Sequence, residues 1–229
     1  MLSQQLFSKT VFRCKIQVEQ NSLPYEQRLI VRDEFQTVSA WQDEAAVTVI
    51  CGLRRCGKST LLRQLKEKYN GYYLNFDDER LVSFGVKDFQ RADEIFHELY
   101  GERQVYYFDE IQNAEGWERF ARRLHDFHKK VCVTGSNARL LSREPGTHLT
   151  GRYLQCTLYP FSFGELLRFR NIEVQSDDFF TTTGRAKLKR ALNDYFEKEH
   201  LRQQKNLSHR QQFCQRAGIP AERRLWTFS

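Results

Sequence analysis

Two hydrophobic patterns alternate along most of this chain. Short runs rich in Val, Ile, Tyr and Phe are typical of buried strands. The longer segments between them have apolar residues about every three or four positions, as amphipathic helices do. The short runs predict strands at Val47–Cys51, Tyr72–Phe76, Val105–Phe108, Val131–Val133 and Tyr153–Leu158.

The segments between these runs predict helices. Leu61, Leu62 and Leu65 lie on one helical face, and the same spacing covers residues 88–100 and 117–127. Strands that alternate with helices in this way indicate βαβ units, so we expect an α/β fold with a mainly parallel, five-stranded sheet. Ligands of such a sheet bind at the carboxyl ends of its strands.

The flanking segments carry weaker patterns. Loosely helical spacing from Pro24 to Asp43 predicts a helix beside the core. Residues 162–165 have the Ser-x-x-Glu spacing of a helix capping box, and residues 185–196 predict an amphipathic helix. After that helix, Gln, Arg and His dominate and the periodicity fades. We therefore expect four parts: a helical leader (1–44), a core of alternating strands and helices (45–160), a helical extension (161–198) and a basic, disordered or aberrant tail (199–229).

The composition is that of a folded protein. Hydrophobic residues make up 40% of the 229 positions, which favours a packed core over disorder. No apolar run approaches the ~20 residues that span a bilayer, and the N-terminus lacks the pattern of a signal peptide. The six cysteines form no C-x-x-C pair. We therefore expect a reduced, cytoplasmic setting without a membrane.

The net charge of +7 raises the hypothesis of nucleic-acid binding. Residues 198–229 contain seven Lys or Arg and two Glu, so this tail supplies five of the seven positive charges. The rest of the chain is nearly balanced. Nucleic acid therefore has only weak support as a partner.

A phosphate-binding motif stands between the first predicted strand and the first predicted helix. Residues 52–60 read GLRRCGKST and match G-x-x-x-x-G-K-[ST], the P-loop or Walker A motif. Its glycines let backbone N–H groups point at phosphate oxygens, and the helix N-terminus favours an anion. We expect Lys58 to reach the β- and γ-phosphates and Ser59 to hold Mg²⁺. The expected nucleotide-binding residues are Gly52, Leu53, Arg54, Arg55, Cys56, Gly57, Lys58, Ser59 and Thr60.

Two carboxylates follow the third predicted strand. Asp109 and Glu110, after the apolar run Val105–Phe108, have the form of a Walker B motif. We expect Asp109 to hold Mg²⁺ opposite Ser59, and Glu110 to accept a proton from the water that attacks the γ-phosphate, or to orient that water. A kinase must keep water from reacting with its nucleotide, so the second carboxylate favours a hydrolase.

Two further groups complete the expected catalytic set. Ser136 and Asn137 follow the fourth predicted strand, where a polar side chain bridges the attacking water and the γ-phosphate in the role called sensor 1; helix capping is the alternative. Hydrolysis also gains from a guanidinium that neutralises charge on the γ-phosphate. Arg139, Arg143 and Arg152 are candidates, and Arg152 is preferred, either within its own subunit or across an interface.

Together these motifs resemble a family of prokaryotic AAA+-like P-loop ATPases. We therefore expect a P-loop NTPase three-layer sandwich, and the resemblance implies that the sensor strand separates the P-loop strand from the Walker B strand. It also implies ATP, since the P-loop alone does not distinguish ATP from GTP. The resemblance covers residues 45 to 196, through GLRRCGKST at 52–60, NFDDERL at 75–81, FDEIQ at 108–112, WERF at 117–120, TGSNARLLS at 134–142, THLTGR at 147–152 and LYPFSF at 158–163.

The resemblance stops near the C-terminus. Members of the family continue after a segment like Tyr195–Lys198 with a second domain of unknown function, whereas this chain reads EHLRQ at 199–203 and ends at Ser229. The loss of apolar periodicity leads us to expect a truncation or a frame shift after about residue 198, with the ATPase core retained.

The sequence thus predicts a Mg²⁺-dependent ATPase domain that couples its nucleotide state to an unknown protein partner, and it is compatible with an oligomer. A small-molecule kinase on the same scaffold is one alternative, which Glu110 and the lack of a recognisable acceptor-binding lid disfavour. A nucleotide-switched nucleic-acid-binding protein is another, which only the basic tail supports.

Overall fold

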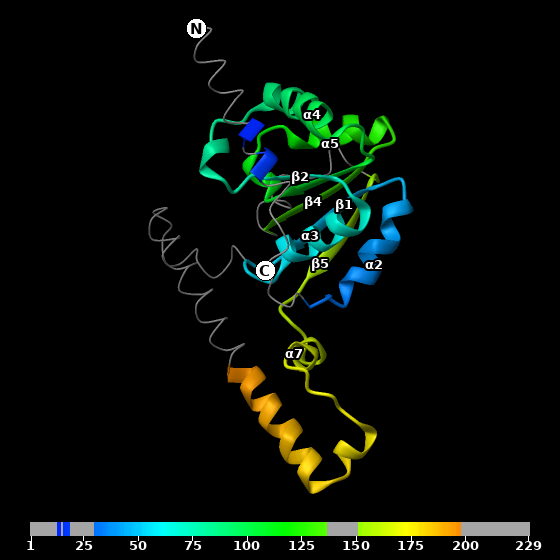
Figure 1. Cartoon of the computed structure of the whole chain (residues 1–229), viewed down its shortest axis with the longest axis vertical. Helices are drawn as coiled ribbons and strands as arrows, with labels where there is room; N and C mark the ends of the chain where they lie inside the picture. The colour runs from blue at the N-terminus through cyan, green and yellow to red at the C-terminus, as the bar shows by residue number, and fades with distance from the viewer. Residues whose placement is uncertain (1–12, 15, 19–29, 137–150, 198–229) are drawn as a thin grey trace. The chain divides into compact units, whose positions relative to one another are not determined.

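The computed structural model describes residues 13–14, 16–18, 30–136 and 151–197 of the chain (Figure 1). The chain divides into two compact units, Met1–Tyr159 and Pro160–Ser229. All the strands of the described residues belong to the first unit.

The first unit is built on a five-stranded sheet with the strand order β2-β3-β4-β1-β5, in which every neighbouring pair is parallel. β4, which ends in the sensor candidate Ser136, lies between β1, which enters the P-loop, and β3, which ends in Asp109. The predicted fold class is therefore confirmed, including the separation of the P-loop and Walker B strands. The strands are β1 (Val47–Gly52), β2 (Tyr72–Asn75), β3 (Val105–Asp109), β4 (Lys130–Ser136) and β5 (Tyr153–Leu158).

Helices pack on both faces of this sheet because successive strand residues point to opposite sides. Tyr72 and Tyr73 illustrate this, since the first lies in the core cluster that includes α4 and α5 residues and the second in the cluster that includes α2 and α3 residues. The result is a three-layer α/β sandwich (Figure 1). Its helices are α2 (Glu34–Ala40), α3 (Lys58–Tyr69), α4 (Val86–Tyr100) and α5 (Trp117–Asp126), with 3-10 turns η1 (Trp41–Asp43), η2 (Glu79–Leu81) and η3 (Ile111–Asn113).

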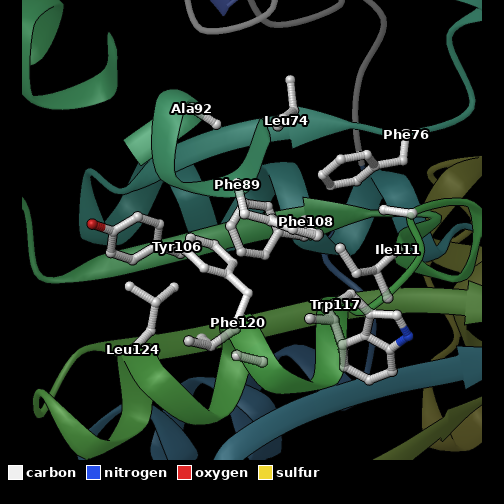
Figure 2. Close-up of a cluster of buried hydrophobic side chains, with 14 of the residues drawn as sticks. Leu74, Phe76, Phe89, Ala92, Tyr106, Phe108, Ile111, Trp117, Phe120 and Leu124 are labelled. Carbon is white, nitrogen blue, oxygen red and sulfur yellow. The ribbon is translucent and has the colours of Figure 1, made fainter. Parts of the chain in front are cut away.

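Aromatic rings fill the layer between the sheet and helices α4 and α5 (Figure 2). The rings of Phe89 on α4 and Phe120 on α5 stack with centroids 4.6 Å apart, and Phe108 on β3 lies 5.9 Å from Phe120. Phe108 directly precedes the Asp109-Glu110 pair. This packing therefore anchors the end of β3 from which both carboxylates project.

The helix expected from Pro24 to Asp43 begins later than predicted within the described residues. α2 starts at Glu34, and residues 30–32 are irregular. The carbonyl of Ile30 accepts a hydrogen bond from Gln64 Nε2 on α3 at 3.0 Å, so this backbone is used for a tertiary contact instead of a helical one. Residues 24–29 lie outside the described part.

The second unit is helical over its described residues. α7 (Phe163–Phe169) opens with the predicted capping box, in which Ser162 Oγ accepts from the Glu165 N–H at 3.1 Å and Glu165 Oε2 accepts from the Ser162 N–H at 2.7 Å. The 3-10 turn η5 (Ser176–Phe179) and a helix over 182–197 follow. Arg170, which directly follows α7, forms an ion pair at 2.8 Å with Asp194 in the helix over 182–197.

None of the helices in the described ranges combines the length and the apolar character that crossing a lipid bilayer requires.

Candidate nucleotide site

The P-loop connects the end of β1 to the start of α3, and its backbone depends on two glycines. Gly52 has a φ of 152°, and a Cβ built there would lie 2.2 Å from the Leu158 carbonyl oxygen of the neighbouring strand β5. Gly57 has a φ of 100°, in a region that favours glycine. Only residues without a side chain fit these two positions, which turn the chain sharply into α3.

Lys58 folds back over this loop. Its side chain is buried, and Nζ donates to the carbonyl oxygens of Leu53 at 3.1 Å and Gly52 at 3.4 Å. Nζ also lies 3.7 Å from Glu110 Oε1. Lys58 and Glu110 are far apart in the sequence, and the fold brings their charged groups together at the ends of β1 and β3.

Asp109 is held at the end of β3 by two hydroxyl groups. Its side chain is buried, with 1% of its surface exposed. Tyr73 Oη donates to Oδ2 at 2.9 Å, and Thr134 Oγ1 donates to Oδ1. Burial and the negative charge of Asp109 raise the pKa of Tyr73 far above its ordinary value, so Tyr73 stays a donor. These two hydrogen bonds fix the orientation of the Asp109 carboxylate.

Glu110 occupies a left-handed backbone conformation with a φ of 50°. Such a conformation is uncommon for a residue with a side chain and occurs often at functional sites. Its N–H donates to Thr134 Oγ1 at 3.0 Å, and Gln112 Nε2 donates to its Oε2 at 2.5 Å. These contacts turn the Glu110 carboxylate toward Lys58.

The donor set fits Mg²⁺. This ion is usually held by one or two carboxylates together with phosphate oxygens and water, without a dedicated all-protein cage. Asp109 supplies a buried carboxylate, and Ser59 lies in the first turn of α3. Among the described residues, no three His, Cys, Asp or Glu side chains gather into a metal cluster of another kind.

The expected loop residues divide by exposure. Leu53, Arg54 and Arg55 are exposed, Cys56 is buried, and Thr60 is half-buried in α3. Burial also raises the pKa of the Cys56 thiol, an effect that neighbouring Lys58 and Arg32 partly oppose. The exposed arginines are free to face solvent or a ligand, and the thiol stays protonated.

Of the two sensor candidates, only Ser136 lies in the part of the chain that the structure describes. Ser136 ends β4 and pairs in register with Gly52, so it stands beside the first residue of the P-loop. Asn137 lies outside the described residues, as do Arg139 and Arg143. The sensor role therefore stays a prediction, with Ser136 placed at the correct edge of the sheet.

Arg152 is not brought to the P-loop of its own chain. It precedes β5, where its carbonyl accepts from the Val47 N–H at 2.8 Å, at the start of β1. The P-loop follows the other end of this strand, about 16–20 Å away for six residues. Arg152 Nη1 instead pairs with Asp126 at 2.8 Å. A role as a finger therefore requires the P-loop of another copy, and that role stays a prediction.

Sequence reasoning missed three residues that shape the site: Arg32, Tyr73 and Thr134. Thr134 is a polar residue that continues an apolar strand, and this signal was available in the sequence. Tyr73 fits the pattern of a strand residue, and the sequence does not indicate that its hydroxyl contacts Asp109. Arg32 stands in the leader, where no motif marks it, yet its guanidinium donates to the P-loop carbonyl of Cys56 at 2.5 Å. Only the folded chain brings this arginine to the loop.

Residues 44–167 match the model of a protein family described as an AAA domain. An uncharacterized protein of Methanocaldococcus jannaschii is 35% identical over 152 residues, which cover 65% of this chain and 34% of that relative. An uncharacterized protein of Haemophilus influenzae is 37% identical over 161 residues, covering 65% of this chain and 40% of the relative. The chain thus spans well under half the length of these curated relatives.

Among solved structures, the Pif1 helicase from Candida albicans is similar over 61% of this chain and 43% of its own, with a TM-score of 0.40 and 16% identity. Similarity at this level carries no information about activity.

Proposed function

This chain belongs to the family of AAA domains, and we propose that it binds ATP with Mg²⁺ and hydrolyses it to ADP and phosphate. We further propose that the nucleotide state is coupled to a protein partner. The observation that supports hydrolysis best is the position of Glu110, whose carboxylate lies 3.7 Å from the P-loop lysine Lys58. A carboxylate at this place is suited to accept a proton from a water molecule beside the γ-phosphate, or to orient that water.

The P-loop is the proposed phosphate site. Lys58 Nζ donates to the carbonyls of Gly52 and Leu53, and it would exchange these neutral acceptors for phosphate oxygens, which carry more negative charge. Ser59 and Asp109 are proposed to hold Mg²⁺, which neutralises charge on the β- and γ-phosphates. The N-terminus of α3 favours the same anion.

Glu110 is the proposed base. It accepts a proton from the attacking water while the water oxygen bonds to the γ-phosphorus and the bond from phosphorus to the bridging oxygen of ADP breaks. Gln112 holds Oε2 of this carboxylate, which leaves Oε1 on the Lys58 side. Ser136 and Asn137 are the proposed sensor residues. Arg152 is proposed to act on the site of a neighbouring copy.

The experiment that tests this proposal measures Mg-ATP binding and phosphate release for the purified chain in parallel. The variant Glu110→Gln removes the base and keeps the shape of the side chain. Glu115→Gln is its matched control, because Glu115 is an exposed residue a few positions along the same segment. Binding of a fluorescent ATP analogue and release of phosphate without an added acceptor are followed for all three proteins.

We expect the parent and Glu115→Gln to bind and hydrolyse ATP. Glu110→Gln should bind ATP normally and lose at least about 100-fold in turnover, the size expected for a general base. Normal turnover in Glu110→Gln would remove the proposed base, and the absence of ATP binding in the parent would remove the function. Phosphate transfer to an added small molecule, in place of release, would favour a kinase.

A further inference from the structure

A buried arginine from the leader contacts the outside of the P-loop. Arg32 is 2% exposed, and it is among the largest fully buried side chains of the described residues. Nη1 donates to the carbonyl of Cys56 at 2.5 Å, and Nη2 donates to the carbonyl of Tyr159 at 2.7 Å. Glu34 Oε2 lies 3.8 Å from Nη2. Arg32 also lies outside the part of the chain that the family model covers, residues 44–167.

The two carbonyls that Arg32 contacts belong to different kinds of backbone. Tyr159 directly follows β5, which pairs with β1 through Gly52↔Leu158, so its carbonyl is attached to the sheet. The Cys56 carbonyl belongs to the P-loop, next to Gly57 with a φ of 100°. Glycine permits many backbone conformations, so the peptide between residues 56 and 57 rotates more easily than others. Arg32 therefore links the backbone of the P-loop to the backbone at the end of β5.

The orientation of the Cys56 carbonyl also determines where the Gly57 N–H points. Peptide bonds in the described residues are trans, and in a trans peptide the C=O and the following N–H point in opposite directions. Because the Cys56 carbonyl points to Arg32, the Gly57 N–H points away from Arg32. A P-loop binds phosphate through N–H groups that point into the loop.

We propose that Arg32 is a positioning residue of the P-loop, which keeps the 56–57 peptide in the orientation that presents the Gly57 N–H to the nucleotide phosphates. This inference rests on the proposed function. The planar fork of a guanidinium aims two separate nitrogens at the two carbonyls, whereas lysine has a single nitrogen on a flexible stem. Space is also limited there, since a Cβ built on Gly57 would lie 3.1 Å from Arg32 Nη1.

Arg32→Gln and Arg32→Lys test this role. The lysine variant keeps the positive charge and most of the buried stem, and it loses the fork. Arg13→Gln is the matched control, because Arg13 also lies in the leader, is 43% exposed and pairs with Glu98 at 2.9 Å. Three quantities are measured for each: the Kd for Mg-ATP, kcat at saturating ATP, and the rate at which a small maleimide alkylates Cys56, followed on the peptide by mass spectrometry.

We expect both Arg32 variants to bind Mg-ATP about tenfold or more weakly, because only a fraction of their loops is in the competent orientation. Saturating ATP selects that orientation, so kcat should stay within about twofold of the parent. Without nucleotide, Cys56 should react several times faster than in the parent, and ATP should restore its protection. Arg13→Gln should match the parent in all three quantities.

An unchanged Kd in a folded Arg32→Gln protein, or a loss confined to kcat, overturns the proposal. Full recovery of binding by Arg32→Lys also overturns it, since charge alone would then be sufficient. Failure of the proposed function is distinguishable, because in that case the parent itself shows no ATP binding. The Cys56 alkylation rate measured without nucleotide requires no ATP binding, so it still reports whether Arg32 holds the loop.

Discussion

The hydroxyl of Thr134 donates a hydrogen bond to Oδ1 of Asp109 and at the same time accepts one from the N–H of Glu110. A single hydroxyl on β4 thus fixes two successive acidic residues at the end of β3. The register of the two parallel strands makes this possible, because Phe108 pairs with Val133 and the residues that follow them are Asp109 and Thr134. Both proposed Walker B residues are therefore held by β4, the strand that ends in the sensor candidate Ser136.

We expect Thr134→Val to impair both carboxylates. Valine has nearly the same shape and no hydroxyl, so Asp109 Oδ1 and the Glu110 N–H each lose a partner, at a cost of about 1–3 kcal/mol in the free energy of unfolding. Turnover of Mg-ATP should fall about 10- to 100-fold. Thr134→Ser keeps the hydroxyl and should retain most of the parent activity. Equal turnover in the valine variant would show that the bridge has no catalytic role.

We expect Lys58→Ala to abolish detectable binding of Mg-ATP, because it removes the cation that faces the phosphates. Titration of a fluorescent ATP analogue checks this, together with a thermal unfolding curve to show that the variant is folded. Lys87→Ala is the control, since Lys87 is exposed on α4, away from the P-loop. Tight binding by folded Lys58→Ala would mean that the nucleotide sits elsewhere.

We expect Gly52→Ala to destabilise the first unit by about 2–4 kcal/mol, because the new Cβ would meet the Leu158 carbonyl and the φ of residue 52 suits glycine. The free energy of unfolding in urea measures this. At Gly85, by contrast, a Cβ would have no neighbour within 4 Å, so Gly85→Ala should change the free energy of unfolding by less than about 1 kcal/mol. Similar stability of both variants would contradict the close approach of β1 and β5.

The stability of the protein should fall in alkaline solution. Burial, aided by the nearby negative charge of Glu34, raises the pKa of Cys156 to about 11 from an ordinary value of 9.0. Between these two pH values the unfolded chain loses the thiol proton and the folded chain keeps it. The contribution of Cys156 to the free energy of unfolding is therefore complete below about pH 9 and is lost as the pH rises through about 11.

Urea unfolding of the parent and of Cys156→Ala at about pH 8 and about pH 10.5 separates this contribution from those of other groups. The variant loses packing and is less stable at both pH values, and its decline with pH should be shallower. Parallel declines of the two proteins would show that Cys156 ionises alike in the folded and unfolded chains.

The sequence predicted the elements whose pattern is local. The strands and helices of the core follow from runs of apolar residues, and the P-loop and the Asp109-Glu110 pair follow from short motifs at strand ends. Parallel order of the strands then brings Lys58 and Glu110 together, since ligand-binding loops gather at one edge of such a sheet. Sequence spacing was sufficient for these features.

The remaining features depend on contacts that no local pattern records. Arg32 donates to the carbonyl of Cys56, 24 positions further along the chain, and the Ile30 carbonyl accepts from Gln64 on α3 in place of a helical partner. Arg152 was expected near the γ-phosphate from its position after the sensor strand. It lies at the opposite end of β1 because it precedes β5 instead of following it.

The close approach of Gly52 to Leu158 gives the first glycine of the P-loop a packing role in addition to any role in binding phosphate. A side chain at residue 52 is excluded by the backbone of β5, whether or not a nucleotide ever binds. A side chain at this position would therefore also destabilise a relative that binds no nucleotide. Retention of the first P-loop glycine in a relative is therefore a mark of shared ancestry and packing, whereas the identity of residues 58 and 110 carries the information about chemistry.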